Sequence, residues 1–143
     1  MNKTILIADD SRLMRMALGR LLRLKGHKVV EAVHGLAGAE ALDYYDLDLI
    51  ITDLNMPILD GMGLVRAVRS HPRAAGVPVI MASGEDSPER RRQARQAGVN
   101  FWLNKPIDAD RLNQIVEWAL ALGEGELPDQ ALPGREGPRA VNG

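Results

Sequence analysis

Acidic side chains follow two short apolar runs of the chain, at the points where the runs end. Asp9 and Asp10 come directly after residues 5–8, and Asp53 comes after a run that ends at Thr52. Each run has the length and the apolar content of a buried strand. A single aspartate after a strand more often caps a turn or a helix. Three carboxylates gathered at one edge of a sheet would repel each other and favour a bound cation.

Two further polar groups follow later apolar runs. Ser83 ends the run 77–83, and Asn104-Lys105-Pro106 follows the run 99–103. Ligands of open α/β sheets bind at the carboxyl ends of the strands, so we expect all these side chains to meet there. Mg²⁺ binds one or two carboxylates together with waters and phosphate oxygens. A lysine ammonium group suits the phosphate. The pattern therefore predicts a site for Mg²⁺ and a phosphoryl group.

Strand-like runs alternate with amphipathic helical stretches, and these elements must position the polar groups. Strands are expected at 3–8, 28–33, 48–52, 77–83 and 99–103, and helices at 12–25, 35–45, 61–70, 86–97 and 108–122. Ser11 is the expected N-cap of the first helix, and Gly26 and Gly98 are expected to end helices. Strand–helix units in series predict a doubly wound parallel sheet with helices on both faces, because each parallel pairing needs a crossover.

Composition narrows the class of protein. The chain has 143 residues, enough for one domain, and its net charge of -1 gives no reason to expect nucleic acid or an anionic membrane as a partner. Cysteine is absent, which excludes disulfides and thiolate chemistry. The apolar run 5–8 is too short for a signal peptide or a membrane span, so we expect a cytoplasmic protein. Residues 123–143 are rich in Gly and Pro and are expected to form a flexible tail or linker after a domain at 1–122.

The motifs together resemble the receiver domain of bacterial two-component response regulators. The matching segments are 7–11, 52–57 with 60–61, 81–84 and 105–106, in order and with the spacing of the family over about residues 3–122. The resemblance implies a flavodoxin-like fold, with five parallel strands in the order 2-1-3-4-5 and five helices. It also implies a signalling module that is no enzyme beyond self-catalysed phosphoryl transfer and slow autodephosphorylation.

The resemblance assigns roles at the metal and phosphoryl site. Asp53 is the phosphoacceptor, which attacks the phosphohistidine of a sensor histidine kinase or a histidine phosphotransfer protein. Mg²⁺ is bound by Asp10, by Asp53 and by the backbone carbonyl of Asn55, with Asp9 acting through water. Lys105 holds a phosphoryl oxygen.

Other roles that the resemblance implies concern how the protein responds to the phosphoryl group. The bond before Pro106 is expected to be cis. Ser83 is expected to bind the phosphoryl group once it is present, and Gly84 leaves room for that group. As Ser83 moves, Trp102 is expected to rotate into the vacated space and so change the contacts with a downstream effector. Strand alternation places the neighbouring Phe101 on the opposite face.

Two positions are expected to set how long the phosphoryl group lasts. Asn55 lies two residues after the acceptor, and Glu85 lies two residues after Ser83. In the family these positions flank the phosphate, and this pair resembles that of the chemotaxis-type single-domain regulators. We therefore expect a phosphoryl state that lasts seconds to minutes.

In two helical stretches, side chains could either serve the fold and its solvation or contact a partner. The stretch 12–25 has more apolar residues than one core stripe needs, and Met14 and Ala17 are candidates for docking a kinase or phosphotransfer domain. The stretch 86–97 has a basic face that we interpret as solvated; it consists of Arg90, Arg91, Arg92 and Arg95.

Other classes fit less well. A haloacid dehalogenase-type phosphatase also uses an aspartate and Mg²⁺, but it requires a second aspartate where Asn55 stands. A Rossmann-like nucleotide-binding protein would need a glycine-rich phosphate loop, which is absent. The chain is either a single-domain regulator, expected to be a monomer or a weak phosphorylation-dependent dimer, or the N-terminal receiver of a longer regulator with an output domain.

Overall fold

The computed structural model describes residues 2–123. The strands are β1 (Thr4–Ala8), β2 (Lys28–Ala32), β3 (Leu49–Asp53), β4 (Val79–Ser83) and β5 (Phe101–Asn104). The helices are α1 (Arg12–Leu24), α2 (Gly35–Ala41), α3 (Gly61–Ser70), α4 (Pro88–Ala97) and α5 (Ala109–Gly123). The expected tail lies outside the described residues, apart from Gly123, which ends α5.

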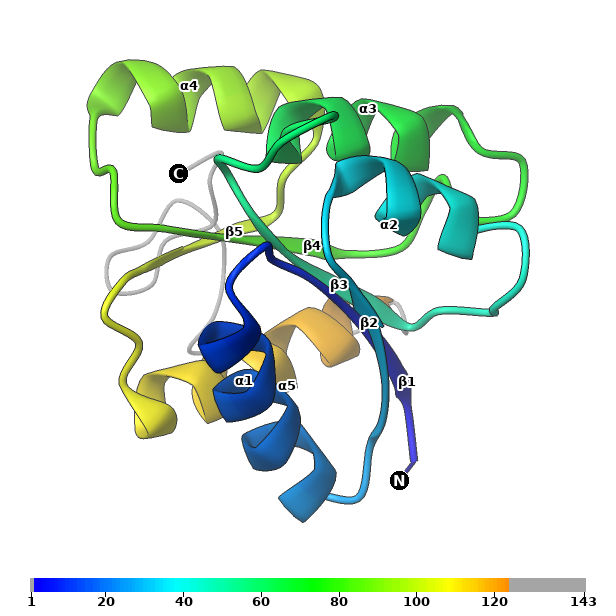
Figure 1. Ribbon diagram of the computed structural model, residues 1–143, viewed down its shortest axis with the longest axis vertical. Coiled ribbons are helices and arrows are strands. Elements are labelled where there is room, and N and C mark those ends of the chain that lie inside the picture. The colour runs from blue at the N-terminus through cyan, green and yellow to red at the C-terminus, as the bar shows by residue number, and fades with distance from the viewer. Residues whose placement is uncertain (1, 124–143) are drawn as a thin grey trace.

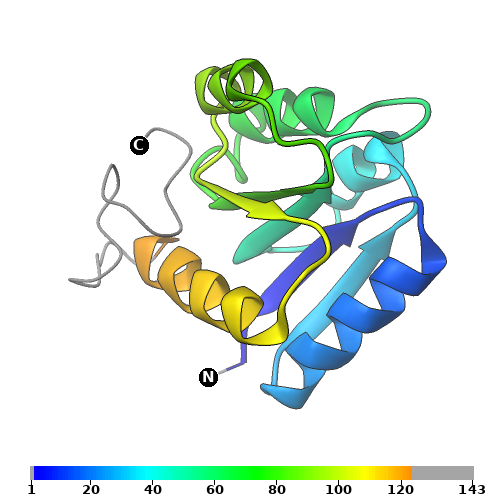
Figure 2. The same cartoon turned by 90° about the vertical axis from the view of Figure 1, so that its left-hand side faces the viewer.

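The strands form one parallel sheet in the order β2-β1-β3-β4-β5. Helices α2, α3 and α4 cover one face of this sheet, and α1 and α5 cover the other (Figures 1 and 2). The order reverses between β1 and β3, where a ligand crevice is expected in an open α/β sheet. The doubly wound, flavodoxin-like fold that the sequence predicted is confirmed.

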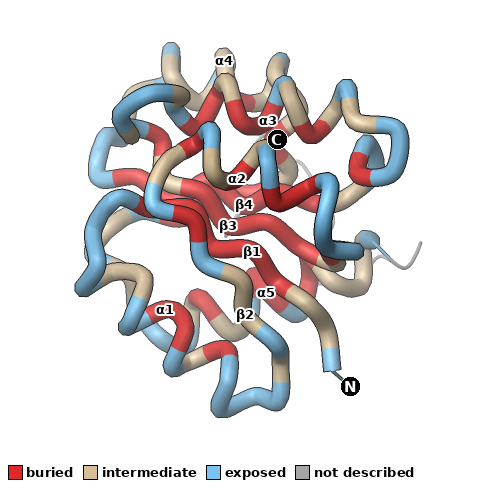
Figure 3. The backbone as a smooth tube through the Cα atoms, turned by 45° about the vertical axis from the view of Figure 1, so that its right-hand side comes forward, coloured by how far each residue is buried: buried red, intermediate tan, exposed pale blue. Residues whose placement is uncertain are grey.

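Four strands of the sheet, β1, β3, β4 and β5, are largely buried, as the red strands in the middle of the molecule show (Figure 3). The edge strand β2 is only partly buried. Successive strand residues belong to opposite halves of the core. Leu6 packs with α2, α3 and α4, whereas Ile5 packs with α1 and α5. The same alternation puts Trp102 on the α4 side and Phe101 on the α5 side, so the predicted separation of these two aromatic residues is confirmed.

The ends of the helices follow local capping rules. The Ser11 hydroxyl accepts a hydrogen bond from the backbone N–H of Met14 at 3.2 Å and so caps α1, as expected. Asp60 caps α3 in the same way through the N–H of Gly63. Gly98 ends α4 with a φ of 113°, a conformation that favours glycine.

Several boundaries differ from those that the sequence predicted. Helix α2 ends at Ala41 rather than near Tyr45, because the N–H groups of the next residues bond three residues back, which tightens the chain into a turn. Strand β4 begins after Pro78, which has no N–H to donate to the ladder. Helix α4 begins at Pro88, since the preceding Ser87 is its N-cap.

The described residues include no helix that is long and apolar enough to cross a membrane.

Candidate functional site

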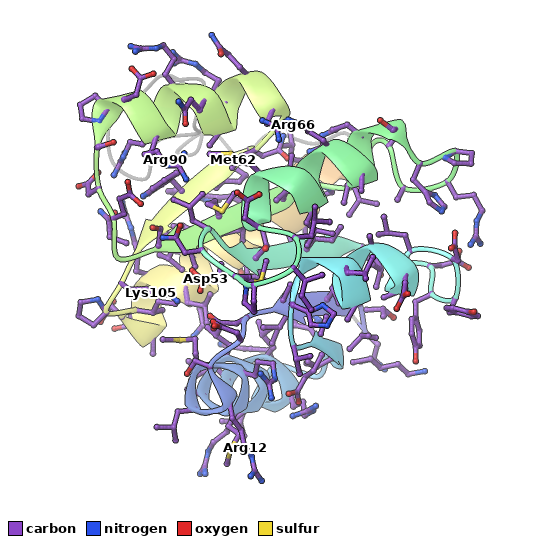
Figure 4. The ribbon with its side chains drawn as sticks, turned by 45° about the horizontal axis from the view of Figure 1, so that its top comes forward. Arg12, Asp53, Met62, Arg66, Arg90 and Lys105 are labelled. Atoms are coloured by element: carbon purple, nitrogen blue, oxygen red, sulfur yellow. The ribbon has the colours of Figure 1, made fainter. Side chains whose placement is uncertain are left out.

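The carboxyl ends of four strands bring the predicted polar residues to one edge of the sheet. In the strand register Ala8 pairs with Thr52, Asp53 pairs with Ala82, and Ser83 pairs with Asn104. Asp9, which follows Ala8, is therefore level with Asp53. Lys105 lies two residues beyond the residue of β5 that is level with Asp53. Figure 4 shows the side chains of Asp53 and Lys105 pointing toward each other at this edge.

The three predicted carboxylates form one cluster. Asp9, Asp10 and Asp53 each offer an oxygen, and these oxygens lie within 4.8 Å of one another. Asp9 is buried, Asp53 is partly buried, and Asp10 is exposed to solvent. Hard oxygen donors with one open side suit Mg²⁺, which keeps several of its waters. Among residues 2–123 this is the only group of three or more His, Cys, Asp or Glu side chains with metal-binding spacing.

Lys105 neutralises part of this negative charge. Its Nζ lies 3.1 Å from Oδ2 of Asp9 and 3.3 Å from Oδ1 of Asp53. The ammonium group therefore bridges the two less exposed carboxylates of the cluster. A lysine in this position is a mobile positive charge, which can also bind a phosphoryl oxygen. The peptide bond between Lys105 and Pro106 is cis.

Asp53 is an unusual carboxyl group in this environment. Burial raises the pKa of Asp53 above its ordinary value, and the negative charge of Asp9 acts in the same direction. The Lys105 charge and a hydrogen bond from the N–H of Leu54 at 2.8 Å act against that rise. The carboxylate is thus poorly solvated and well oriented, which suits a nucleophile.

The backbone after Asp53 approaches the strand closely. A Cβ atom on Gly61 would lie 2.2 Å from the carbonyl oxygen of Asp53, so only glycine fits there. The N–H of Gly61 donates to the carbonyl of Leu54 at 2.8 Å. Ile58, in the same β3–α3 loop, has a φ of 72°, a strained conformation for a β-branched residue. Such strain is typical of loops at functional sites.

Ser83 lies at the end of β4 with its hydroxyl turned toward the following loop. Its Oγ accepts a hydrogen bond from the N–H of Glu85 at 2.9 Å. A Cβ on Gly84 would meet no atom within 4 Å, so the space beside Gly84 is open, in line with its expected role. Both residues lie at the same sheet edge as Asp53.

Asn55 and Glu85 face each other across the site. The Nδ2 of Asn55 lies 3.5 Å from Oε1 of Glu85, and Nε of Arg90 lies 3.6 Å from the other oxygen of Glu85. The sequence predicted the first two of these residues at the rim of the site. It did not predict Arg90, which it assigned to a solvated basic face.

Trp102 is buried, with 4% of its surface exposed. Its indole Nε1 donates to Oδ1 of Asn104 at 3.0 Å, and Cζ of Arg91 lies 5.4 Å from the centre of its ring. The sequence did not predict this contact of Arg91. Residues 91 and 102 belong to different elements, so only the register of α4 against β5 brings them together, and a single sequence does not reveal that register.

The remaining side chains singled out in the sequence lie on α1 and α4. Met14 is partly buried and packs on the α1–α5 side of the core, whereas Ala17 is exposed. Of the basic face on α4, Arg91 pairs with Asp86 and Arg92 with Glu89. The second tryptophan of the chain, Trp118, is a core residue of α5.

Comparison with known proteins gives the family. The model of the response regulator receiver domain matches residues 5–117. The CheY homolog of Campylobacter jejuni is 36% identical over 124 residues, which cover 85% of this chain and 95% of that protein. A gliding motility regulatory protein of Myxococcus xanthus is 40% identical over 101 residues, and the match spans 71% of this chain but only 13% of that larger protein.

Solved structures agree with the sequence relatives. CheY4 of Vibrio cholerae superimposes with a TM-score of 0.78 at 29% identity, covering 82% of this chain and 98% of that one. The receiver domain of a sensor histidine kinase from Pseudomonas aeruginosa has a TM-score of 0.78 at 25% identity, and the match covers 85% of this chain and 99% of that one. That structure is described with a magnesium ion coordinated in its active-site cleft. The chain therefore belongs to the response regulator receiver domain family, the CheY-like signalling domains of two-component phosphorelays.

Proposed function

We propose that Asp53 accepts a phosphoryl group from the phosphohistidine of a sensor histidine kinase or phosphotransfer protein. The observation that carries the proposal is the bridge from Lys105 to Asp9 and Asp53, at 3.1 and 3.3 Å, within a cluster of three carboxylates. This set combines a nucleophile, oxygen ligands for a divalent cation and a cation for the phosphoryl oxygens. The resemblance of the motifs assigns the same roles.

The proposed reaction is a direct displacement at phosphorus. An oxygen of Asp53 forms a bond to phosphorus while the bond from phosphorus to the imidazole nitrogen breaks, and the imidazole leaves with the electron pair and takes up a proton. Lys105 would shift from the Asp53 carboxylate to an oxygen of the phosphoryl group. Asp9 would then remain its fixed partner.

Asp10, Asp53 and the backbone carbonyl of Asn55 would hold Mg²⁺, with Asp9 acting through water. The exposed position of Asp10 and the proximity of the three carboxylates fit this group. When bound, Mg²⁺ supplies positive charge that offsets the charge on the phosphoryl oxygens during transfer. The magnesium described in the related kinase receiver domain supports the assignment.

The signal would pass from Ser83 to Trp102. Ser83 would turn its hydroxyl from the Glu85 amide toward a phosphoryl oxygen, assisted by the open space at Gly84. Asn55 and Glu85 lie across the site from each other and would help set the rate at which water hydrolyses the phosphoryl group. We infer a short-lived phosphoryl state of seconds to minutes. We also infer that the functional domain comprises residues 1–122, acts in the cytoplasm and changes its contacts with an effector protein.

The test uses the whole chain, Mg²⁺ and acetyl phosphate, a small phosphodonor. Mass spectrometry of the intact protein should show one added phosphoryl group, which should require Mg²⁺ and be absent in Asp53→Asn. The variant Asp46→Asn, a carboxylate exposed away from the site, is the matched control and should be modified like the wild type. Modification elsewhere, or rapid multiple turnover of the donor as in a phosphatase, would contradict the proposal.

A further inference from the structure

We propose that Arg91 couples the β4–α4 loop to Trp102, so that a movement of this loop beside Ser83 changes the environment of the indole. The inference rests on the proposed function and deepens it, because it assigns the connection between the phosphoryl site and the readout residue. Arg91 acts as a positioning residue and touches no reacting atom.

Arg91 holds Trp102 from its face, and a shared neighbour holds it from its edge. The guanidinium carbon lies 5.4 Å from the ring centre, within the range of a cation–π contact. Oδ1 of Asn104 accepts from the indole Nε1 at 3.0 Å and from Nη2 of Arg91 at 3.5 Å. The planar guanidinium suits this combination of stacking and hydrogen bonding, which an ammonium group would not reproduce.

The same guanidinium is tied to the loop that follows Ser83. Its Nε donates to Oδ1 of Asp86 at 2.8 Å. The preceding residue, Glu85, donates its backbone N–H to the Ser83 hydroxyl at 2.9 Å. A continuous series of contacts therefore runs from Ser83 through residues 85 and 86 to Arg91, and from there to Trp102.

The loop has room to move. A Cβ on Gly84 would meet no atom within 4 Å, so the space beside this residue is open. If Ser83 approaches a phosphoryl oxygen, its bond with the Glu85 amide must lengthen or carry the loop along. Asp86 would then draw Arg91 away from the ring of Trp102 or press it closer.

The burial of Trp102 gives this coupling its importance. With 4% of its surface exposed, the indole already packs with the α2–α4 side of the core. The indole is therefore already enclosed under α4, where a movement of Arg91 changes its surroundings directly. The contact with Arg91 is the one through which the loop would act on this ring.

Arg92 offers a matched control. It is the next residue on α4, is exposed, and pairs with Glu89 of its own helix rather than with the loop or with Trp102. A substitution at Arg92 removes the same charge from the same helix but leaves the contacts of Trp102 intact.

The experiment follows Trp102 fluorescence in the whole chain. The sequence has two tryptophans, so all proteins carry Trp118→Phe to make Trp102 the only one. Emission and quenching by acrylamide are measured in Mg²⁺ before and after addition of beryllofluoride, an analogue of the phosphoryl group. The proteins compared are the Trp118→Phe parent, Arg91→Leu, Arg91→Lys, Asp86→Asn and Arg92→Leu.

The coupling predicts a distinct pattern. Beryllofluoride should change the emission of the parent and of Arg92→Leu equally. Asp86→Asn should leave the resting emission unchanged but reduce the response by about twofold or more, since the loop is no longer tied to Arg91. Arg91→Leu should alter the resting emission and lose the response, and Arg91→Lys should restore part of both.

The outcomes separate this inference from the proposed function. Phosphorylation of Asp53 is measured on the same proteins with acetyl phosphate and mass spectrometry. If all proteins are phosphorylated and Asp86→Asn and Arg91→Leu respond like Arg92→Leu, the coupling is overturned and the proposed function stands. A parent whose emission does not change also overturns the coupling. If the parent is not phosphorylated at all, the proposed function fails and the inference fails with it.

Discussion

Among the three carboxylates of the cluster, Asp10 has the largest effect on the balance between charge repulsion and metal binding. Lys105 bridges Asp9 and Asp53, but not Asp10, which faces solvent with its oxygen within 4.8 Å of the other two carboxylates. Two unit charges at this spacing repel by about 1 kcal/mol even in water. The site is thus built with excess negative charge that a divalent cation would relieve.

We predict that Asp10→Asn stabilises the metal-free protein and weakens its response to Mg²⁺. The free energy of unfolding without metal should rise by about 1 kcal/mol or less, because one of three repelling charges is removed. The stabilisation that Mg²⁺ gives the wild type should largely disappear, since a ligand is lost. Urea denaturation in Mg²⁺ or in a chelator measures both effects.

The matched control for this prediction is Asp46→Asn, a carboxylate that pairs with Arg73 at 3.2 Å on an exposed surface. It should keep the full response to Mg²⁺. An Asp10→Asn protein that Mg²⁺ stabilises as strongly as the wild type would show that the cluster is no metal site.

At the residue scale, the sequence predicted the members of the site better than their contacts. The positions of Asp9, Asp53 and Lys105 follow from strand ends, because strand ends are visible as boundaries of apolar runs. The contact of Arg91 with Trp102 depends on how α4 lies over β5, and that of Arg90 with Glu85 depends on the path of the β4–α4 loop. Four arginines in one helix are equally typical of a solvated face. Only the tertiary packing shows which of these arginines contact other elements.

At the scale of elements, Arg69 fixes the end of α3 to two neighbouring segments. Its guanidinium donates to the carbonyl oxygen of Gly98 at 3.1 and 2.6 Å, to those of Ala75 and Val77 at 2.9 and 2.6 Å, and to Oδ1 of Asn100 at 2.9 Å. These contacts use all the N–H donors that an arginine has. Burial lowers the pKa of Arg69, but the ordinary pKa of arginine is so high that the side chain stays charged in the folded protein.

We predict that Arg69→Met destabilises the fold by about 2–4 kcal/mol, because it leaves several partly buried carbonyl groups without a donor. Arg69→Lys should also cost more than about 1 kcal/mol, since an ammonium group cannot reproduce the planar fork. Urea denaturation gives both values. Arg66→Met, an exposed arginine on the same helix, is the control and should change stability by less than about 0.5 kcal/mol. A lysine variant as stable as the wild type would contradict the assigned role.

The boundaries of three elements differ from the predicted ones for different physical reasons. Pro78 shortens β4 and Ser87 sets the start of α4, and both effects follow from local properties of proline and of N-cap residues that the sequence shows. The early end of α2 is different. The segment after Ala41 continues to place apolar residues at helical spacing, and it tightens into a turn that only the tertiary structure selects.

At the scale of the whole molecule, the sheet order was predictable because alternating strands and helices allow few topologies. Continuous apolar runs indicated strands covered on both faces, and the two halves of the core confirm it. No functional group was predicted at the edge of the sheet opposite the carboxylate cluster. There, His27 lines an open pocket of about 380 Å³ with Lys3, Lys25 and Glu117.

His27 makes the stability of the whole fold depend on pH. Burial lowers the pKa of His27 below its ordinary value, Lys3 adds to that effect, and Asp48 acts against it. The Nδ1 atom accepts a hydrogen bond from the backbone N–H of Lys3 at 3.3 Å, which requires it to carry no proton. The unfolded chain therefore takes up a proton at a higher pH than the folded chain does.

The sign of the effect follows from this difference. The contribution of His27 to stability is present above its unfolded pKa of about 6.5 and is lost as the pH falls through the lower folded pKa. We predict that the wild type loses stability relative to His27→Gln when the pH is lowered from about 8 to about 5. The loss should be small because the ring is only partly buried, and urea denaturation of both proteins at each pH measures it. Both proteins contain the same other titratable groups, so the difference between their free energies of unfolding isolates His27. A difference that stays constant with pH, or that changes in the opposite direction, would contradict the assignment.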